Sequence, residues 1–224
     1  MTTLYLRTVS ADYTSHGAFQ WPREVGAVVE APDWNPEPVC GGGLHGLPWG
    51  QGALGLLGDN GDDVWLVVAA DHAVRIDNDK SKFPRCTIVY VGTRDGACAY
   101  LLERAPRDVA VPYVHATAGC NGTATAGYGG TATAGDGGTA TAGYRGTATA
   151  GDGGTATAGD EGTATAGDEG TATAGDEGTL VITYSDKTGR RLLCVGYVGE
   201  DGIMPGTAYR VINGKLTNKA EITS

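Results

Sequence analysis

The chain contains 224 residues, of which 38 are glycine, and it carries a formal net charge of −10. Glycine does not recur at every third position and proline occurs only 9 times, which excludes a collagen triple helix. The acidic balance excludes binding of nucleic acid through a basic face, because such a face needs clustered Lys and Arg. The longest apolar run, Val64–Ala70, is much shorter than the ~18 residues that a membrane-spanning helix needs, so we expect no membrane span.

The N-terminus lacks the basic start and the apolar stretch of a secretion signal. We therefore expect a cytoplasmic protein, with a surface-associated or phage-associated location as the open alternative. The cysteines are odd in number, scattered and without a CxxC pair, which argues against a disulfide framework or a zinc ribbon. We expect reduced thiols, no metal site and no cofactor; the cysteines are Cys40, Cys86, Cys98, Cys120 and Cys194.

Residues 1–113 have an ordinary globular composition and contain all four tryptophans. Runs of β-branched and apolar residues in this region predict several strands, and one short segment favours a helix. We therefore expect a small α+β or mainly β globular domain over 1–113. The predicted strands are Leu4–Arg7, Ala27–Glu30, Val64–Ala69 and Thr87–Val91, and the predicted helix is Ala97–Glu103.

Glycines crowd a cysteine and a histidine in the segment Pro38–Gly50. Such crowding indicates either a close approach of the backbone to a neighbour or a ligand-binding loop. The segment is neither a phosphate-binding Walker loop nor a dinucleotide fingerprint. Metal binding by Cys40 and His45 with His72 or Cys86 is an alternative that no spacing motif supports. The candidate ligand loop comprises Cys40, Gly42, His45 and Trp49.

The strongest signal is an octapeptide repeat over residues 114–179. Seven copies of Gly-Thr-Ala-Thr-Ala-Gly recur with a period of eight, and a degenerate copy stands on each side. Low complexity is often a sign of disorder, but the strict period and the alternation of β-branched with small residues favour β structure. The copies begin at Gly122, Gly130, Gly138, Gly146, Gly154, Gly162 and Gly170.

The two variable residues of each octapeptide show a longer period. Tyr128 and Tyr144 are 16 positions apart, and so are Asp136, Asp152 and Asp168. We therefore expect two octapeptides, or 16 residues, in each coil of a parallel β-solenoid whose strands stack at ~4.8 Å. Because side chains alternate faces along a strand, alanine should point into a thin core and threonine outward.

The segment Ala126-Gly-Tyr-Gly-Gly-Thr-Ala-Thr133 resembles the Ala-Gly-Tyr-Gly-Ser-Thr-x-Thr octapeptide of bacterial ice nucleation proteins, with Gly in place of Ser. The resemblance covers residues 116–179 and implies a β-solenoid with outward Thr-x-Thr rows that order water or bind ice. It also implies a tyrosine ladder, here Tyr128 and Tyr144, that serves self-association. The implied water-ordering residues are Thr123, Thr125, Thr131, Thr133, Thr139, Thr141, Thr147, Thr149, Thr155, Thr157, Thr163, Thr165, Thr171 and Thr173.

Acidic residues occupy many of the variable positions. In the predicted coil, Asp136, Asp152 and Asp168 stack on one edge, whereas the tyrosines, Asp160 and Asp176 stack on the other. Two interpretations remain open for these columns. One is calcium binding, although the spacing differs from that of the known calcium-binding nonapeptide. The other is a solvated acidic edge that discourages lateral aggregation.

Residues 180–224 regain apolar residues and predict a β cap over the last coil. Asn213-Gly214 between two strand-like runs is a strong signal for a type I′ hairpin. An open terminal coil would pair with other chains, which a cap prevents. The predicted strands are Leu180–Tyr184, Arg191–Val195, Tyr209–Ile212 and Lys215–Thr217.

The leading hypothesis is a non-enzymatic repeat protein that acts by self-association or scaffolding, as a homodimer or larger assembly through a solenoid face or edge, and by ordering water. The alternative is an N-terminal enzyme or ligand-binding module that the solenoid spaces or assembles. For that alternative, Leu4-Tyr5-Leu6-Arg7 and the glycine-rich stretch Gly41–Trp49 weakly resemble ADP-ribosyltransferases, with His45 in place of their Tyr.

Overall fold

The structure, a computed structural model, describes residues 3–58, 60–76, 80–106 and 109–222. The chain divides into two compact units, 1–111 and 112–224, each with its own core. Within the described residues, no helix has the length and apolar character that crossing a bilayer requires.

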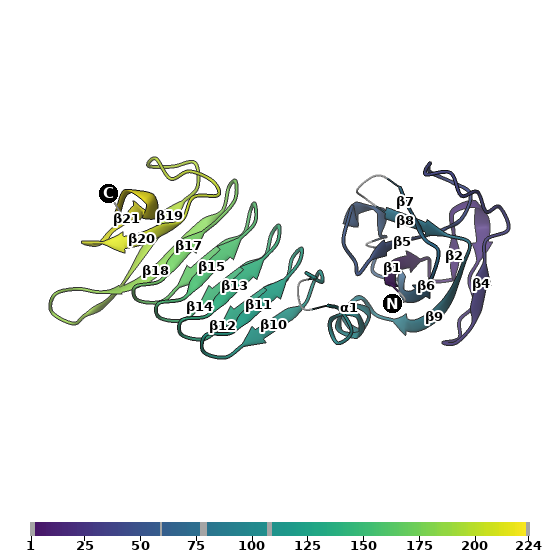
Figure 1. Ribbon diagram of the computed structural model, residues 1–224, viewed down its shortest axis with the longest axis horizontal. Helices are drawn as coiled ribbons and strands as arrows, with labels where there is room; N and C mark the ends of the chain where they lie inside the picture. Colours follow the sequence, from purple (N-terminus) through teal and green to yellow (C-terminus); the bar gives the residue numbers. More distant parts are fainter. Residues whose placement is uncertain (1–2, 59, 77–79, 107–108, 223–224) are drawn as a thin grey trace. The chain divides into compact units, whose positions relative to one another are not determined.

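The N-terminal unit is built on one antiparallel sheet of seven strands in the order β4-β9-β6-β1-β5-β8-β7 (Figure 1). A small hairpin of β2 and β3 and one helix, α1, accompany it. The elements are β1 (Thr3–Val9), β2 (Thr14–Ser15), β3 (Phe19–Gln20), β4 (Val28–Glu30), β5 (Leu44–Pro48), β6 (Val64–Ala70), β7 (Val74–Ile76), β8 (Lys80–Phe83), β9 (Arg85–Gly92) and α1 (Arg94–Leu102).

The core of this unit lies against the central strands. Leu66 and Val68 of β6 are fully buried and belong to a cluster with Trp21, Phe83 and Ile88. The uninterrupted apolar run of β6 is what a strand covered on both faces requires. Helix α1 begins where the Thr93 side chain accepts a hydrogen bond from Gly96 N, and it buries Ala97, Cys98 and Leu101.

The four strands predicted here are confirmed, and the helix forms but begins at Arg94, three residues before the predicted start. The prediction of a loop is wrong for Leu44–Pro48, which is strand β5. The alternative of close backbone approach is confirmed: a Cβ on Gly46 would lie 2.8 Å from Tyr5 Cβ, and one on Gly43 would lie 3.0 Å from the Trp34 ring. The glycines therefore serve strand packing.

The second unit is a parallel β-solenoid of about four turns over residues 115–182. Partner residues in neighbouring coils are 16 apart, as in Thr131 with Thr147 and Thr123 with Thr139. Successive strands alternate between two sheets, so each coil supplies one strand to each (Figure 1). The predicted coil of two octapeptides is thus confirmed. The strands are β10 (His115–Ala118), β11 (Thr123–Ala126), β12 (Thr131–Ala134), β13 (Thr139–Ala142), β14 (Thr147–Ala150), β15 (Thr155–Ala158), β16 (Thr163–Ala166), β17 (Thr171–Thr173) and β18 (Thr179–Ser185).

The alanines of the repeat form the interior of the solenoid. Ala132, Ala140, Ala148 and Ala156 are all fully buried, whereas the strand threonines of the repeat are partly or fully exposed, with one exception. Thr171 is buried, so the prediction that it faces solvent is wrong. Its strand β17 pairs with β20 of the cap, at Ala172 with Tyr209, so the cap lies directly beside it.

The corners between strands depend on a left-handed backbone at the second variable residue. Gly153 has φ +66°, and Arg145 and Glu161 have φ +54° and +55° at the same position of other octapeptides. Glycine adopts this conformation without a steric penalty, whereas other residues pay for it. Gly138, which precedes a strand, is needed for a different reason: the backbone of Gly135 passes so close that a Cβ on Gly138 would lie 2.8 Å from Gly135 O.

The cap consists of two hairpins, each of which extends one sheet of the solenoid. Strand β18 pairs in parallel with β16 and antiparallel with β19 (Arg191–Tyr197), whereas β20 (Tyr209–Ile212) pairs antiparallel with β17 and β21 (Lys215–Asn218). A short helix, α2 (Lys219–Ile222), follows. The predicted Asn213-Gly214 turn is confirmed, with φ +50° and +78°.

Candidate functional site

The two outer surfaces of the solenoid are rows of threonine. The first threonine face belongs to the sheet β10-β12-β14-β16-β18-β19 and the second to the sheet β11-β13-β15-β17-β20-β21. On the first face, Thr131, Thr147 and Thr163 stand in one row, and Thr133, Thr149 and Thr165 stand in another. Each threonine pairs with its equivalent in the next coil, so both rows are straight.

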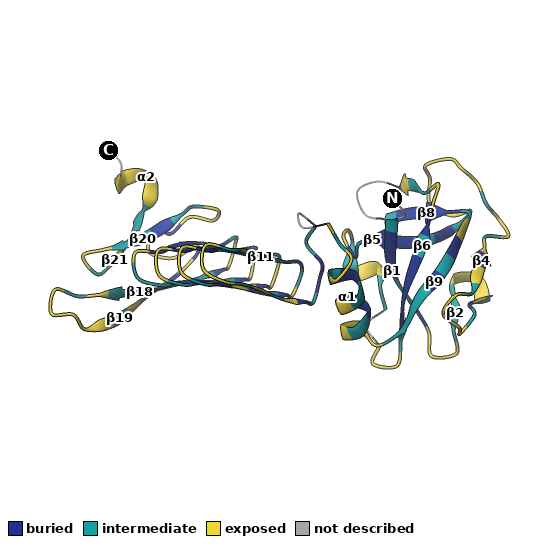
Figure 2. Ribbon diagram, turned by 60° about the horizontal axis from the view of Figure 1, so that its bottom comes forward, coloured by how far each residue is buried: buried dark blue, intermediate teal, exposed yellow. Residues whose placement is uncertain are grey.

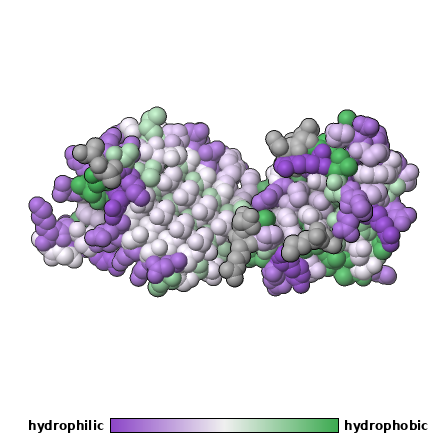
Figure 3. Space-filling view, viewed as in Figure 1, coloured by the Kyte–Doolittle hydropathy of each residue, from purple (hydrophilic) through white to green (hydrophobic). Residues whose placement is uncertain are grey.

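The geometry of these faces follows from sheet spacing. Equivalent threonines repeat at ~4.8 Å from coil to coil, and the two threonines of one strand lie ~6.7 Å apart. The second face carries the same pattern, with Thr139 aligned to Thr155 and Thr141 aligned to Thr157. The surface of the solenoid in view in Figure 3 is pale over its strands, and strongly hydrophilic residues stand mainly at its margins and over the cap. Each face therefore presents hydroxyl and methyl groups on a regular two-dimensional grid.

The tyrosines stack at one edge of the solenoid, as their 16-residue spacing predicts. The ring centroids of Tyr128 and Tyr144 are 5.3 Å apart in a stacked arrangement, and Tyr113 meets Tyr128 edge-on at 5.4 Å. The Tyr144 hydroxyl donates a hydrogen bond to Glu161, whose other oxygen accepts from Arg145 Nε at 2.8 Å. The hydrogen bond to Glu161 also raises the pKa of Tyr144. Tyr113 was not foreseen as a member, because it precedes the first recognisable repeat.

The aspartates form hydrogen-bonded ladders at the corners. Asp136 Oδ1 accepts a hydrogen bond from Asp152 N at 3.1 Å, and Asp152 Oδ1 accepts one from Asp168 N at 2.8 Å. On the opposite edge, Asp160 Oδ1 accepts from Asp176 N at 3.0 Å. Each carboxylate thus bonds to the backbone of the next coil, so the aspartates hold the stacked corners together.

The candidate ligand residues of the N-terminal unit do not converge. His45 stands near the start of β5, and Trp49 follows the end of this strand, so about 13 Å of extended chain separates them. Cys40 is exposed, and its Sγ accepts a hydrogen bond from Lys80 Nζ at 3.2 Å. Gly42 has a left-handed backbone, with φ +61°. Within the described residues, no three His, Cys, Asp or Glu side chains gather where they could hold a metal ion.

A basic pair at the centre of this unit has incomplete hydrogen bonding. Arg7 lies 3.7 Å above the Trp21 ring, and its Nη1 donates to His45 O at 3.1 Å. Arg7 Nε and His45 Nε2 are both buried without a partner among the described residues. Burial lowers the pKa of Arg7 to about 10, and burial together with Lys80, Arg7 and Lys82 lowers the pKa of His45 to about 4. Arg7 is the one charged residue of strand Thr3–Val9, and this is the sequence signal that could have indicated the pair.

Lys82 fixes the glycine-rich segment to the sheet. Its side chain is fully buried, and Nζ donates to Val39 O at 2.8 Å and to Gly41 O at 2.9 Å. The ammonium also lies 5.9 Å from the centroid of the Trp34 ring. A buried lysine is stable only when its charge is satisfied in this way. Lys82 therefore serves structure here.

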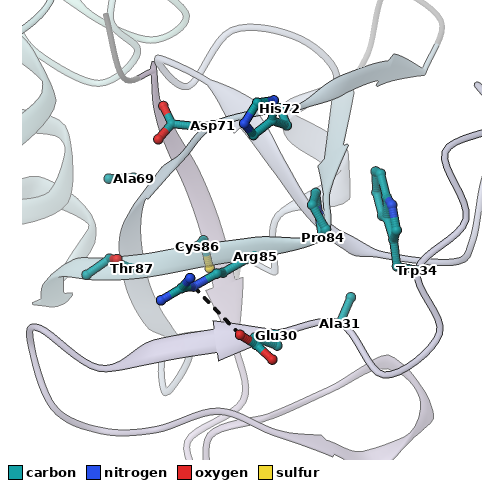
Figure 4. A pocket seen from close by; sticks show the side chains of 10 residues that line it. All are labelled: Glu30, Ala31, Trp34, Ala69, Asp71, His72, Pro84, Arg85, Cys86 and Thr87. Carbon is teal, nitrogen blue, oxygen red and sulfur yellow. Dashed lines mark ion pairs between the residues drawn. The ribbon is translucent and has the colours of Figure 1, made fainter.

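A shallow groove of about 640 Å³ opens beside β9 (Figure 4). Asp71 and His72 follow the end of β6 on one side, and Trp34 stands on the other. An ion pair between Arg85 Nε and Glu30 Oε1, 3.7 Å apart, joins β9 to β4 at this groove. Both side chains of this pair are well exposed, so the pair contributes little to stability. The groove has mixed charge, and burial raises the pKa of Cys86, the cysteine that lines it, to about 12, so its geometry assigns no reaction.

Fold and surface together define the class of this protein: it is a capped parallel β-solenoid with two aligned threonine faces and a separate N-terminal domain. Comparison with known proteins narrows this class. The chain is 34% identical over 110 residues to an ice nucleation protein of Pseudomonas fluorescens, a match that covers 48% of this chain and 9% of the relative.

Two further relatives agree. The ice nucleation protein InaU of Pantoea ananas is 34% identical over 119 residues, which covers 52% of this chain and 11% of the relative. An ice nucleation protein of Xanthomonas campestris pv. translucens is 34% identical over 106 residues, or 46% and 7% of the two chains. The resemblance of the repeat is thus confirmed, and the solenoid is an ice-nucleation-type repeat region. The matches span about a tenth of the length of these relatives.

The N-terminal unit matches a different family. Residues 3–98 fit the model of a domain of unknown function (DUF7666), which names no activity. No solved structure matches the chain.

Proposed function

We propose that the solenoid orders water on its two threonine faces and acts as a small ice-nucleation-like element. The observation that carries this proposal is the in-register stacking of threonine, row by row, over successive coils. The names of the relatives support the same proposal, because those proteins are called ice nucleation proteins.

The backbone beneath the threonine rows is rigid. Each strand is hydrogen-bonded to its neighbours, and each corner is tied by a backbone bond such as Gly137 N to Asp152 O at 2.8 Å. Hydroxyls on such a frame keep fixed positions, so waters bonded to them are held at a regular spacing at little additional entropic cost. The methyl groups of threonine leave the waters between hydroxyls free to bond to one another. The array therefore favours an ordered water layer over the bulk arrangement.

Self-association belongs to the same proposal. One solenoid has only about four coils, and the area over which water is ordered grows when copies lie side by side. The edge with Tyr128 and Tyr144 is one surface for this, because Tyr144 is 37% exposed and the rings are already stacked. Aromatic rings at an interface bury a large area for little loss of side-chain entropy.

A charged side chain on a threonine face tests the water-ordering part. Thr149→Arg places a bulky, strongly hydrated group in a row of the first face, and we expect the freezing temperature of droplets and the thermal hysteresis to fall toward those of buffer. Asn121→Arg is the matched control: it adds the same charge at a corner, where Arg145 already occupies the equivalent position.

The circular dichroism spectrum of both variants should match that of the original chain. Purified protein that freezes like buffer, whether dispersed or clustered, would refute the water-ordering part of this proposal.

A further inference from the structure

Strand β19, the last strand of the first sheet, presents a contiguous row of exposed apolar side chains. Leu193, Val195 and Tyr197 are 66%, 48% and 54% exposed. They lie on the first threonine face, because Tyr197 pairs with Thr179 and Val195 with Val181. Figure 2 shows the outer part of this hairpin as exposed. A contiguous apolar row on a soluble protein indicates an interaction surface, whereas single exposed apolar residues do not.

The backbone of the same strand has a free edge. Two hydrogen bonds show which residues of β19 are bonded to β18. They join Val198 N to Gly178 O at 2.9 Å and Asp186 N to Arg190 O at 3.0 Å. Because hydrogen-bonded pairs alternate along an antiparallel ladder, the backbones of the even-numbered residues of β19 bond to β18. The odd-numbered residues direct their N–H and C=O groups away from β18. Within the part of the chain that the structure describes, no strand pairs with this outer edge.

The inner face of β19 is packed, which keeps the edge rigid. Ile203 and Leu216 lie where a side chain on Gly196 would project. Cys194, which is partly buried, has its Sγ 3.7 Å from Gly214 O. A rigid apolar edge strand without covering elements is a template for pairing with another strand.

We propose that β19 pairs antiparallel with β19 of a second copy of this chain, about a twofold axis at Cys194. This inference deepens the self-association part of the proposed function by giving it an interface distinct from the tyrosine edge. In this register Leu193 bonds with Val195 of the second copy, and Arg191 bonds with its Tyr197. Every residue of the strand is then paired, whereas a shift of the axis by one residue or more leaves some residues without a partner.

Charges on the flanking turns fit the same register. In this register Lys187 of one copy is opposite Asp201 of the other, and the axis repeats this contact at the opposite end. Both side chains are exposed. Arg190 and Asp186 also lie there but already form an ion pair within the hairpin, 3.5 Å apart. A chain with net charge −10 repels its copies, so local attraction of this kind steers the pairing.

The consequence is a continuous sheet that runs through both copies. Because the twofold axis is perpendicular to an antiparallel sheet, the first threonine faces of the two copies point to the same side. The apolar row lies between them, and the area of ordered hydroxyls on that side doubles. The pairing thus enlarges one threonine face and leaves the second face of each copy unchanged.

Sedimentation of the full chain tests the interface. We expect the original chain to form dimers and the double variant Leu193→Glu, Val195→Glu to weaken dimerisation by at least about tenfold, since two pairs of like charges then oppose each other at the contact. Val25→Glu is the matched control, because Val25 is 63% exposed in the N-terminal unit. Circular dichroism checks that the variants keep the fold.

Two further measurements test the register. In a chain with Cys40→Ser and Cys120→Ser, oxidation should link Cys194 to Cys194, because directly opposed residues of a non-hydrogen-bonded pair have Cα atoms ~4.5 Å apart, within disulfide range. Lys187→Glu should weaken the dimer, and Lys187→Glu combined with Asp201→Lys should restore it.

A monomeric original chain would overturn the inference. So would a dimer that survives Leu193→Glu, Val195→Glu but dissociates in Tyr144→Ala, a result that assigns association to the tyrosine edge. A dimer without the Cys194 link or the charge rescue overturns the register. Loss of freezing activity with an intact β19 dimer contradicts water ordering and leaves this interface standing.

Discussion

At the residue scale, the repeat is a compromise between backbone conformation and side-chain chemistry. The second variable residue of each octapeptide has a left-handed backbone whether it is glycine, arginine or glutamate. The first variable residue supplies a group that bonds to the next coil, as Asp136 and Asp152 do. Glycine occupies only some of these corners. At other corners, arginine or glutamate adds charge to the surface but is strained in the left-handed conformation.

Gly153 isolates the cost of this conformation. Its φ is +66°, and no atom of the described residues lies within 4 Å of the position of an added Cβ, so a substitution acts through backbone strain. We expect Gly153→Ala to lower the free energy of unfolding of the solenoid by about 1 kcal/mol. Gly153→Asn should cost less, because Asn visits this conformation more readily. Urea unfolding followed by circular dichroism measures both, and an Ala variant as stable as the original would contradict the assignment.

His45 makes the stability of the N-terminal unit depend on pH. Its pKa in the folded chain is about 4, below the ordinary 6.5, because burial and the charges of Lys80, Arg7 and Lys82 disfavour its protonated form, with Asp33 acting in the opposite direction. Between these two values the unfolded state binds more protons, so stability falls as the pH is lowered from 6.5 toward 4.

The four tryptophans all lie in this unit, so their fluorescence during urea unfolding reports on it alone. We expect His45→Gln to flatten the pH dependence over this interval relative to the original chain. An unchanged slope in the variant would show that another group is responsible.

At the element scale, the two sheets approach closely because only methyl groups lie between them. Ala148 and Ala156 are fully buried. In the last coil, Leu180 and Ile182 occupy alanine positions, opposite Ala164 and Ala166 of β16. Larger side chains are thus placed only where the cap, and not another alanine strand, closes the core.

A larger side chain in the middle of the solenoid should therefore be costly. We expect Ala148→Val to lower the free energy of unfolding by about 1–3 kcal/mol, because two extra methyl groups must fit into a closed core. Thr149→Val, one residue further on the outer surface, keeps the shape of the side chain and should change stability little. Thermal unfolding followed by circular dichroism compares the two, and equal effects would contradict an alanine core.

At the scale of the whole molecule, activity should grow with the number of coils. Duplication of residues 138–153 adds one complete coil and one strand to each threonine face, and the 16-residue register is preserved. We expect this longer chain to freeze droplets at a higher temperature than the original.

The matched control has the same duplication with lysine in place of the added threonines. It has the same length but no additional hydroxyl rows, and we expect it to freeze droplets no better than the original chain. Equal freezing temperatures for the two longer chains would show that length alone is responsible.

The sequence by itself determined the repeat unit, the 16-residue coil, the inward alanines, the tyrosine and aspartate columns and the hairpin turn at Asn213. These features depend on local periodicity, which the order of residues expresses directly. Only the tertiary structure decided that Leu44–Pro48 is a strand, that Arg7 meets His45 and that Thr171 is buried beside the cap. It also decided that, among the strands that the structure describes, β19 is left at an open edge of its sheet. Such features arise from contacts between residues far apart in the chain, and neither composition nor period specifies which partners meet.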